Sequence, residues 1–208
     1  MNFLFIGILF TYFIGKIFQR FQKFDGIILS DYGAGTITES IKKLIVRYAG
    51  QNKIPGIVDS RYRIGAFEGI GYAKQNDAEL AAFAKIEIND MTDLIDAGSK
   101  LLAALNSDGV LITRGEEGMS LFERGGAVHH IPVTDKSEVF DVSGAGDTCV
   151  AAFMLALTAG AEPVNAARIS NYAAGVAVRK YGTSTVNSSE LLKALKNFAN
   201  EIGEQNAD

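Results

Sequence analysis

Short apolar runs alternate with stretches of helical periodicity along most of this 208-residue chain. The runs have the length of buried strands, and each ends near a polar or glycine-containing loop. They occupy residues 25–29, 55–58, 71–74 and 109–113. Two further runs, 119–123 and 128–133, are separated by Arg124, Gly125 and Gly126, and this spacing predicts a β-hairpin.

Apolar residues three and four positions apart predict helices between these strands. One begins after Thr36 or Thr38, one after Asn76, and another spans 91–105. After the hairpin in the sequence, helices are expected over about 147–159, 163–180 and 189–201, the last capped by Ser188 or Ser189. Strands that alternate with helices in this way predict an α/β fold, in which a mainly parallel central sheet lies between helical layers (αβα).

Several polar loops directly follow the predicted strands. They are residues 30–35, 59–61 and 113–118. Because ligands of open α/β sheets bind outside the carboxyl ends of the strands, we expect these loops to gather at the edge that carries the site.

Composition narrows the class of protein. The chain is 48% hydrophobic and 21% charged, which is typical of a globular domain. A net charge of -4 gives no basic footprint, so nucleic acid is not expected as the main partner. The single cysteine, Cys149, cannot form an internal disulfide, which suits a reducing, cytoplasmic location.

The first 24 residues differ from the remainder, 25–208. Residues 2–15 carry no charge, but this stretch is shorter than the roughly 20 residues that a membrane-spanning helix needs. A secretory signal is not expected, because the basic start and the small-residue cleavage site are missing. Two interpretations stay open: a membrane anchor over residues 2–18, or a buried helix whose packing partners or upstream sequence are missing.

The segment Asp-Val-Ser-Gly-Ala-Gly-Asp-Thr at 141–148 is the most informative in the chain. A small-residue turn that opens a helix directs unpartnered N–H groups toward one point, where they favour an anion. A carboxylate at this point, Asp147, would repel a resting phosphate. The simplest chemical reason for it is that Asp147 takes a proton from a hydroxyl that attacks a phosphoryl group. The alternative is a glycine-rich helix start without any ligand.

The full octapeptide resembles the signature of the ribokinase-like (PfkB) carbohydrate kinases. The resemblance implies that Asp147 is the general base and that the amides of Gly144, Ala145 and Gly146 form the anion hole. It also implies ATP-dependent transfer of a phosphoryl group to a hydroxyl of a sugar or sugar phosphate. The segments around Asp31 and at 59–61 resemble the heptose-phosphate kinase branch of that family.

Two segments ahead of the octapeptide fit the same family. Asn76 and Glu79 are explained by a helix N-cap with a capping box, but they also resemble the family's N-x-x-E motif, which implies that Glu79 helps to position Mg²⁺ through water. The turn at 113–118 resembles a segment that lines the nucleotide pocket. Its residues with an implied nucleotide contact are Thr113, Arg114, Gly115 and Gly118.

Two more groups of residues follow from the resemblance. It places Asn171 near the adenine of ATP. It also implies a monovalent cation, such as K⁺, close to the octapeptide. The implied ligands of this cation are Asp141, Ser143, Gly182 and Ser184.

The resemblance covers about residues 25–200, the later two thirds of a family member. The N-terminal βαβ unit, with its Gly-Gly and Asn sugar-binding motif, and the β-sheet lid are not found. We therefore expect a truncated kinase core whose exposed sheet flank invites association, for example as a homodimer. A non-catalytic nucleotide-binding remnant or interaction module is the alternative function, and the sugar itself is not predicted.

Overall fold

The computed structural model describes residues 24–133 and 139–205. The apolar segment at 2–15 lies outside the described residues, so both interpretations of it remain predictions. In the described part of the chain, no helix has the length and hydrophobicity needed to cross a membrane.

The strands and helices follow the predicted order. The strands are β1 (Ile27–Asp31), β2 (Gly56–Ser60), β3 (Tyr72–Asn76), β4 (Gly109–Thr113), β5 (Met119–Glu123) and β6 (Val128–Ile131). The α-helices are α2 (Glu39–Asn52), α3 (Asp77–Ala84), α4 (Met91–Leu105), α5 (Ala145–Thr158), α6 (Pro163–Ala177) and α7 (Ser188–Gln205), with short 3-10 turns at Ile64–Ala66 and Gly115–Glu117.

The six strands form one sheet in sequential order, β1 to β6. Strands β1 to β4 pair in parallel, and β4, β5 and β6 pair antiparallel. The expected mainly parallel sheet and its hairpin are therefore confirmed. Strand β1 is an edge of this sheet, and its Ile28 is 47% exposed.

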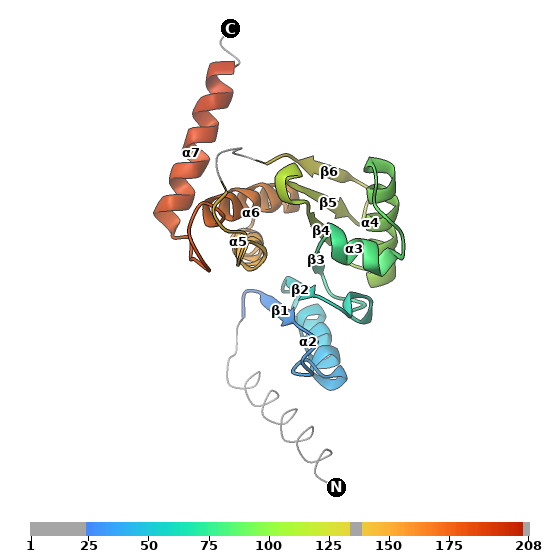
Figure 1. Ribbon diagram of the computed structural model, residues 1–208. Coiled ribbons are helices and arrows are strands. Elements are labelled where there is room, and N and C mark those ends of the chain that lie inside the picture. Colours follow the sequence, from blue (N-terminus) through green and yellow to red (C-terminus); the bar gives the residue numbers. More distant parts are fainter. Residues whose placement is uncertain (1–23, 134–138, 206–208) are drawn as a thin grey trace.

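Helices cover both faces of the sheet and complete the predicted three layers (Figure 1). On one face, α2, α3 and α4 bury apolar residues in a cluster that includes Ile45, Leu80 and Leu101. On the other face, α5 and α6 form a second cluster around Phe153. Helix α7 contacts α6 and projects away from the sheet (Figure 1).

Alternation along the strands separates the polar residues at the carboxyl end of the sheet onto two faces. Ile57 and Tyr72 pack on the α5 side, so Asp59 and Lys74, two positions further along, point the same way. Val58 and Ala73 pack on the α2–α4 side. Ser60 and Gln75 therefore belong to that side, together with Asp31 of β1, which follows the buried Leu29 by two positions.

Several boundaries differ from the sequence prediction. Strand β1 ends at Asp31 rather than at residue 29, because its polar end pairs in register with Ser60. Strand β3 likewise continues to Asn76, which lies opposite Thr113. Pairing with a neighbouring strand stabilises extended backbone even where the side chains are polar. Helix α6 ends at Ala177 rather than at residue 180.

The structure also decides between the candidate helix caps. The Thr38 hydroxyl, and not that of Thr36, accepts a hydrogen bond from the backbone N–H of Ile41 at 3.3 Å. The prediction for α7 is wrong. Asn187, rather than Ser188 or Ser189, accepts from the N–H of Glu190 (3.0 Å), whose carboxylate accepts from the N–H of Asn187 (2.9 Å). This reciprocal pair satisfies two helix-end donors at once, which a serine cap alone does not.

A buried carboxylate ties β1 to β2 on the α2–α4 side. Asp31, 3% exposed, accepts hydrogen bonds from the Ser60 hydroxyl (2.9 Å), the Gly33 backbone N–H (3.1 Å) and Arg63 Nη2 (3.0 and 3.1 Å). Burial opposes ionisation of Asp31, but these donors, Arg63 first among them, outweigh it and lower its pKa. Gln75 extends the network by donating to the Ser60 carbonyl at 3.0 Å.

Replacing Asp31 with Asn removes the charge that holds Arg63, and we expect the free energy of unfolding at neutral pH to fall by about 2 kcal/mol. Because the pKa of Asp31 is lowered on folding, its stabilisation is complete above about pH 4 and is lost as the pH falls further. Urea unfolding of the native chain and of Asp31→Asn should therefore differ at neutral pH and converge in acid. A difference that stays constant on acidification would contradict this account.

Candidate functional site

The loop at 141–148 opens α5 as the sequence predicts. Gly144 is the N-cap residue, with φ of 80°, a left-handed conformation that favours glycine. The N–H of Ala145 donates to the Val142 carbonyl (3.2 Å), and that of Thr148 donates to the Gly144 carbonyl (2.9 Å). Within the described residues, the N–H groups of Gly144, Gly146 and Asp147 have no acceptor. The start of α5 therefore offers backbone donors to an anion.

Asp147 lies in the first turn of α5, and its side chain is exposed rather than turned into the core. With Gly144 and Thr148 it lines a cavity of about 770 Å³ between α5, α6 and α7. The further walls of this cavity are mainly apolar and include Leu155 and Leu192. A carboxylate in this position is accessible to a molecule that enters from solvent, as a general base must be.

The structure adds Lys74, a residue to which the sequence analysis assigned no role. A Cβ atom built on Gly146 would stand only 3.0 Å from Lys74 Nζ. The ammonium of Lys74 therefore lies directly against the backbone of the anion-binding turn. Lys74 is buried, 6% exposed, and its Nζ pairs with Asp59 Oδ2 at 3.1 Å. The signal in the sequence is a lysine in the middle of an otherwise buried strand.

Burial acts on both members of this ion pair. Burial by itself would lower the pKa of Lys74, but the nearby carboxylates, Asp59 first, raise it above its usual value. For Asp59, burial raises the pKa, and the charges of Glu79 and Asp147 act in the same direction against the effect of Lys74. Three carboxylates and one ammonium thus act on one another at the carboxyl end of the strands.

Asn76 and Glu79 form the capping box that their spacing predicts. Asn76 Oδ1 accepts from the N–H of Glu79 (2.8 Å), and Glu79 Oε2 accepts from the N–H of Asn76 (2.9 Å). Only Oε2 of the Glu79 carboxylate is used in this way. Carboxylates that lie close together and retain free oxygens suit Mg²⁺, which keeps part of its water shell. Among the described residues, no group of three or more His, Cys, Asp or Glu side chains forms a direct metal site.

The turn after β4 lies next to this capping box. The Thr113 hydroxyl donates to the Gln75 carbonyl at 3.4 Å. The Arg114 side chain forms an ion pair with Glu117 and lies 3.8 Å from Asp77, at the start of α3. In this structure, Arg114 is thus engaged with carboxylates of the protein itself.

The two glycines of that turn have different surroundings. A Cβ on Gly118 would approach the Ile131 carbonyl oxygen at 2.1 Å, so close packing against the end of β6 requires glycine there. Gly115 has φ of 54° and open space around it. Asn171 is buried and donates from Nδ2 to the Pro132 carbonyl (2.7 Å), which fixes the chain where it leaves β6. Gly118 and Asn171 thus both have a structural role at the end of β6.

Three of the four residues implied in cation binding, Asp141, Ser143 and Gly182, contact one another through the Asp141 carboxylate. The two oxygens of this carboxylate accept from the N–H groups of Ser143 (2.8 Å) and Gly182 (3.1 Å), and these hydrogen bonds, that of Ser143 first, lower the pKa of Asp141. Asp141 thereby joins the loop at 181–184 to the start of α5. The Ser184 hydroxyl lies 3.5 Å from the Ala177 carbonyl. The group offers carboxylate, hydroxyl and carbonyl oxygens, the ligand type that a hard monovalent cation prefers.

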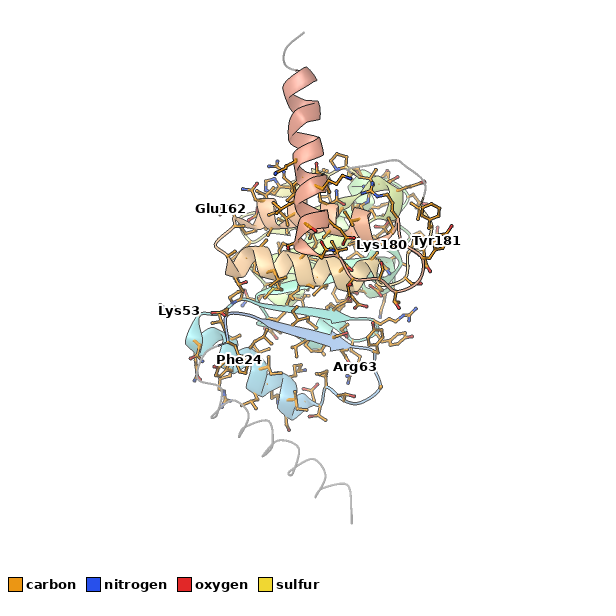
Figure 2. The ribbon with its side chains drawn as sticks, turned by 90° about the vertical axis from the view of Figure 1, so that its left-hand side faces the viewer. Phe24, Lys53, Arg63, Glu162, Lys180 and Tyr181 are labelled. Atoms are coloured by element: carbon orange, nitrogen blue, oxygen red, sulfur yellow. The ribbon has the colours of Figure 1, made fainter. Side chains whose placement is uncertain are left out.

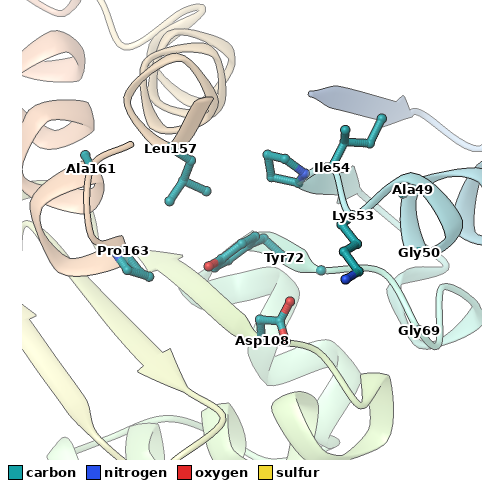
Figure 3. A pocket seen from close by; sticks show the side chains of 12 residues that line it. Ala49, Gly50, Lys53, Ile54, Gly69, Tyr72, Asp108, Leu157, Ala161 and Pro163 are labelled. Atoms are coloured by element: carbon teal, nitrogen blue, oxygen red, sulfur yellow. The ribbon is translucent and has the colours of Figure 1, made fainter. Parts of the chain in front are cut away.

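A second cavity lies at the opposite end of the sheet. Figure 2 shows Arg63, Lys180 and Tyr181 at the carboxyl end of the strands, and Lys53 and Glu162 at the other end. The second cavity, of about 490 Å³, is lined by residues that include Lys53, Tyr72 and Asp108 (Figure 3). It contains none of the predicted site residues, and it lies away from the unpartnered N–H groups of α5.

Comparison with known proteins identifies the family of the chain. Residues 17–190 match the model of the pfkB family of carbohydrate kinases. The chain is 40% identical over 183 residues to the bifunctional protein HldE of Geobacter metallireducens, and 42% identical over 175 residues to that of Geobacter sulfurreducens. These matches cover 88% and 84% of the chain but only 37% and 36% of the relatives. The chain thus spans little more than a third of the length of the curated relatives it matches.

Solved structures show the same fold. The ribokinase of Arabidopsis thaliana, determined with ribose and ATP, has a TM-score of 0.73 at 23% identity, over 83% of this chain and 56% of that one. Phosphofructokinase-2 of Escherichia coli, determined with potassium, also has a TM-score of 0.73, at 20% identity, over 84% of this chain and 57% of that one. The predicted ribokinase-like fold is confirmed, and the chain belongs to the pfkB family of carbohydrate kinases.

Proposed function

We propose that this chain carries the catalytic part of an ATP-dependent phosphotransferase that acts on a hydroxyl of a sugar or sugar phosphate. The observation that carries the proposal is the exposed Asp147 beside unpartnered N–H groups and the ammonium of Lys74. A base, backbone donors and a fixed positive charge at one point suit the transfer of a phosphoryl group to a hydroxyl.

In the proposed reaction, the Asp147 carboxylate accepts the proton of the acceptor hydroxyl as its oxygen attacks the γ-phosphorus of ATP. The bond between that phosphorus and the β–γ bridging oxygen breaks, and ADP leaves. The N–H groups of Gly144 and Gly146, with that of Asp147, donate to the phosphoryl oxygens, while Lys74 balances their charge. In this structure, the N–H of Ala145 donates to Val142, so the proposed role of its amide requires a shift of that turn.

Oxygen-bearing side chains near the start of α5 and of α3 support the two proposed ions. Glu79 would help to hold Mg²⁺ through water, and the bound ion would supply positive charge to the phosphates of ATP. Asp141, Ser143, Gly182 and Ser184 would surround a monovalent cation such as K⁺. The nucleotide would lie along Thr113, Gly115 and Asn171, on the side of α6.

A heptose phosphate is the acceptor that we propose. The support is the likeness of the segments around Asp31 and at 59–61 to the heptose-phosphate kinase branch, together with the identity of about two fifths to the HldE proteins. A reducing, cytoplasmic setting, where ATP is available, fits the single buried Cys149.

A non-catalytic nucleotide-binding module is the second candidate. One observation favours it: the N–H of Ala145, which the family resemblance assigns to the anion hole, already donates to the Val142 carbonyl at 3.2 Å. Turnover separates the two candidates, because a binding module would take up ATP without transferring phosphate to any sugar or sugar phosphate.

Removing the carboxylate of Asp147 tests its proposed role as the base. We expect Asp147→Asn to lower the rate of phosphoryl transfer by a factor of about 10² to 10⁴, because a neutral amide cannot accept the proton. ATP binding, measured by calorimetry, should change little, because Asp147 lies at the acceptor hydroxyl. A variant as active as the native chain would refute this role.

The second prediction concerns Gly146. In Gly146→Ala, the new methyl group meets the end of the flexible Lys74 side chain, so the protein should fold while the ammonium is displaced. We expect the transfer rate to fall by about 10²-fold or more, the typical effect of losing one such electrostatic contact. Gly50→Ala in α2 is the matched control, since a Cβ there meets nothing within 4 Å. Equal transfer rates for the two variants would contradict the proposed contact.

The third prediction concerns the substrate. Thermal-shift measurements with ATP, ADP and a panel of sugars and sugar phosphates should show stabilisation by the nucleotides and, among acceptors, the largest stabilisation by a heptose phosphate. ATP consumption with the same panel then tests turnover. Stabilisation by nucleotide without turnover on any acceptor would favour the binding module.

A further inference from the structure

Lys74 has a long flexible side chain, but its contacts hold the ammonium in one position. Its Nζ pairs with Asp59 Oδ2 at 3.1 Å, and the side chains are 7% and 19% exposed. The two residues lie opposite each other in the parallel pairing of β2 and β3 and point to the α5 side. Their backbones are therefore fixed by the sheet, and the ion pair fixes the end of the lysine beneath Gly146.

The surroundings of this ammonium show why it needs a partner. The charges that act on Lys74 are those of Asp59 and Glu79, with the Cys149 thiol behind it, and Asp147 adds its charge at Asp59. Burial favours the uncharged lysine, and Asp59 opposes this more than any other group does. Without Asp59, the lysine would lose both its anchor and much of the reason for its charge.

We infer that Asp59 is a positioning residue for phosphoryl transfer, which acts by holding the Lys74 ammonium beneath the Gly146 turn. The inference rests on the proposed function, in which Lys74 balances the charge of the transferred group. It assigns to Asp59 an effect that disappears when Lys74 is absent. A purely structural ion pair, or a carboxylate that acts on the reaction independently, would behave differently.

A double-mutant cycle tests the inference on the full chain. Lys74→Met keeps the length of the side chain and removes the charge, and Asp59→Asn keeps the shape and removes the charge. We expect Lys74→Met to lower kcat by about 10²-fold, and Asp59→Asn by about tenfold with a smaller change in the KM for ATP. The double variant should be no worse than Lys74→Met, because Asp59 then has nothing to position.

The pH dependence gives a second readout. In Asp59→Asn, the pKa of Lys74 loses the contribution that raised it, so transfer should decline on the alkaline side at a lower pH than in the native chain. Glu79, Asp147 and Cys149 also face this group, and they are unchanged in the variant. The same alkaline decline should be absent from Lys74→Met, in which no lysine titrates.

Asp108→Asn is the control, because Asp108 is also an ion-paired carboxylate next to a strand, but it lies at the opposite end of the sheet, away from the candidate site. It should leave kcat unchanged. Independent, multiplicative losses in the double variant, or an Asp59→Asn variant with native kcat and pH profile, would overturn the inference.

Failure of the proposed function would look different. If the native chain transfers no phosphate, the proposed function fails, and the cycle is then measured on ATP affinity by calorimetry. Non-additive effects on that affinity would still support the positioning of Lys74 by Asp59, and additive effects would overturn it.

Discussion

The contact between the Lys74 ammonium and the turn at Gly146 is the interaction on which the site depends. It joins the sheet to the start of α5, where Asp147 is exposed and where N–H groups have no partner among the residues that the structure describes. A helix start alone attracts anions weakly in water. A buried positive charge at the same place makes the attraction stronger and gives it a fixed direction, because the surrounding protein screens it less than water does. Without this contact, the loop at 141–148 would be only a glycine-rich helix start.

The sheet places this contact by simple alternation. Strand residues that point to the α5 side at the carboxyl end, Asp59 and Lys74, form the polar floor of the site. Their immediate neighbours in sequence, Ser60 and Gln75, point the other way and belong to the network of Asp31. That network connects β1 and β2 and closes the end of the apolar cluster beneath α2 and α4. At the carboxyl end of the sheet, the residues that face α5 thus belong to the candidate site, and the next residues in sequence belong to the structural network on the other face.

Much of this arrangement could be predicted from the sequence. The order of the elements and the parallel sheet followed from the apolar periods, and the family followed from the octapeptide at 141–148. The capping box at Asn76 was also predicted, because its geometry depends on residues three positions apart. Strand ends were placed less well, since pairing between strands extended β1 and β3 through polar residues.

The role of Lys74 could not be predicted in the same way. Its approach to Gly146 joins residues more than seventy positions apart, and it depends on how α5 packs over the sheet. The engagement of Arg114 with Asp77 and Glu117, and of Asn171 with Pro132, likewise comes from tertiary packing. Residue types and their spacing indicate which side chains could belong to the site, but tertiary packing determines which of them contact one another.

In the proposed reaction, the start of α5 and Lys74 together bind the transferred phosphoryl group. A crystal structure with ADP, Mg²⁺ and a fluoride mimic of that group would locate its binding site. We expect the mimic to lie within hydrogen-bond distance of the Gly146 N–H and of Lys74 Nζ, with the Asp147 carboxylate on its acceptor side. A mimic bound elsewhere, with Lys74 in contact with Asp59 alone, would contradict the proposal.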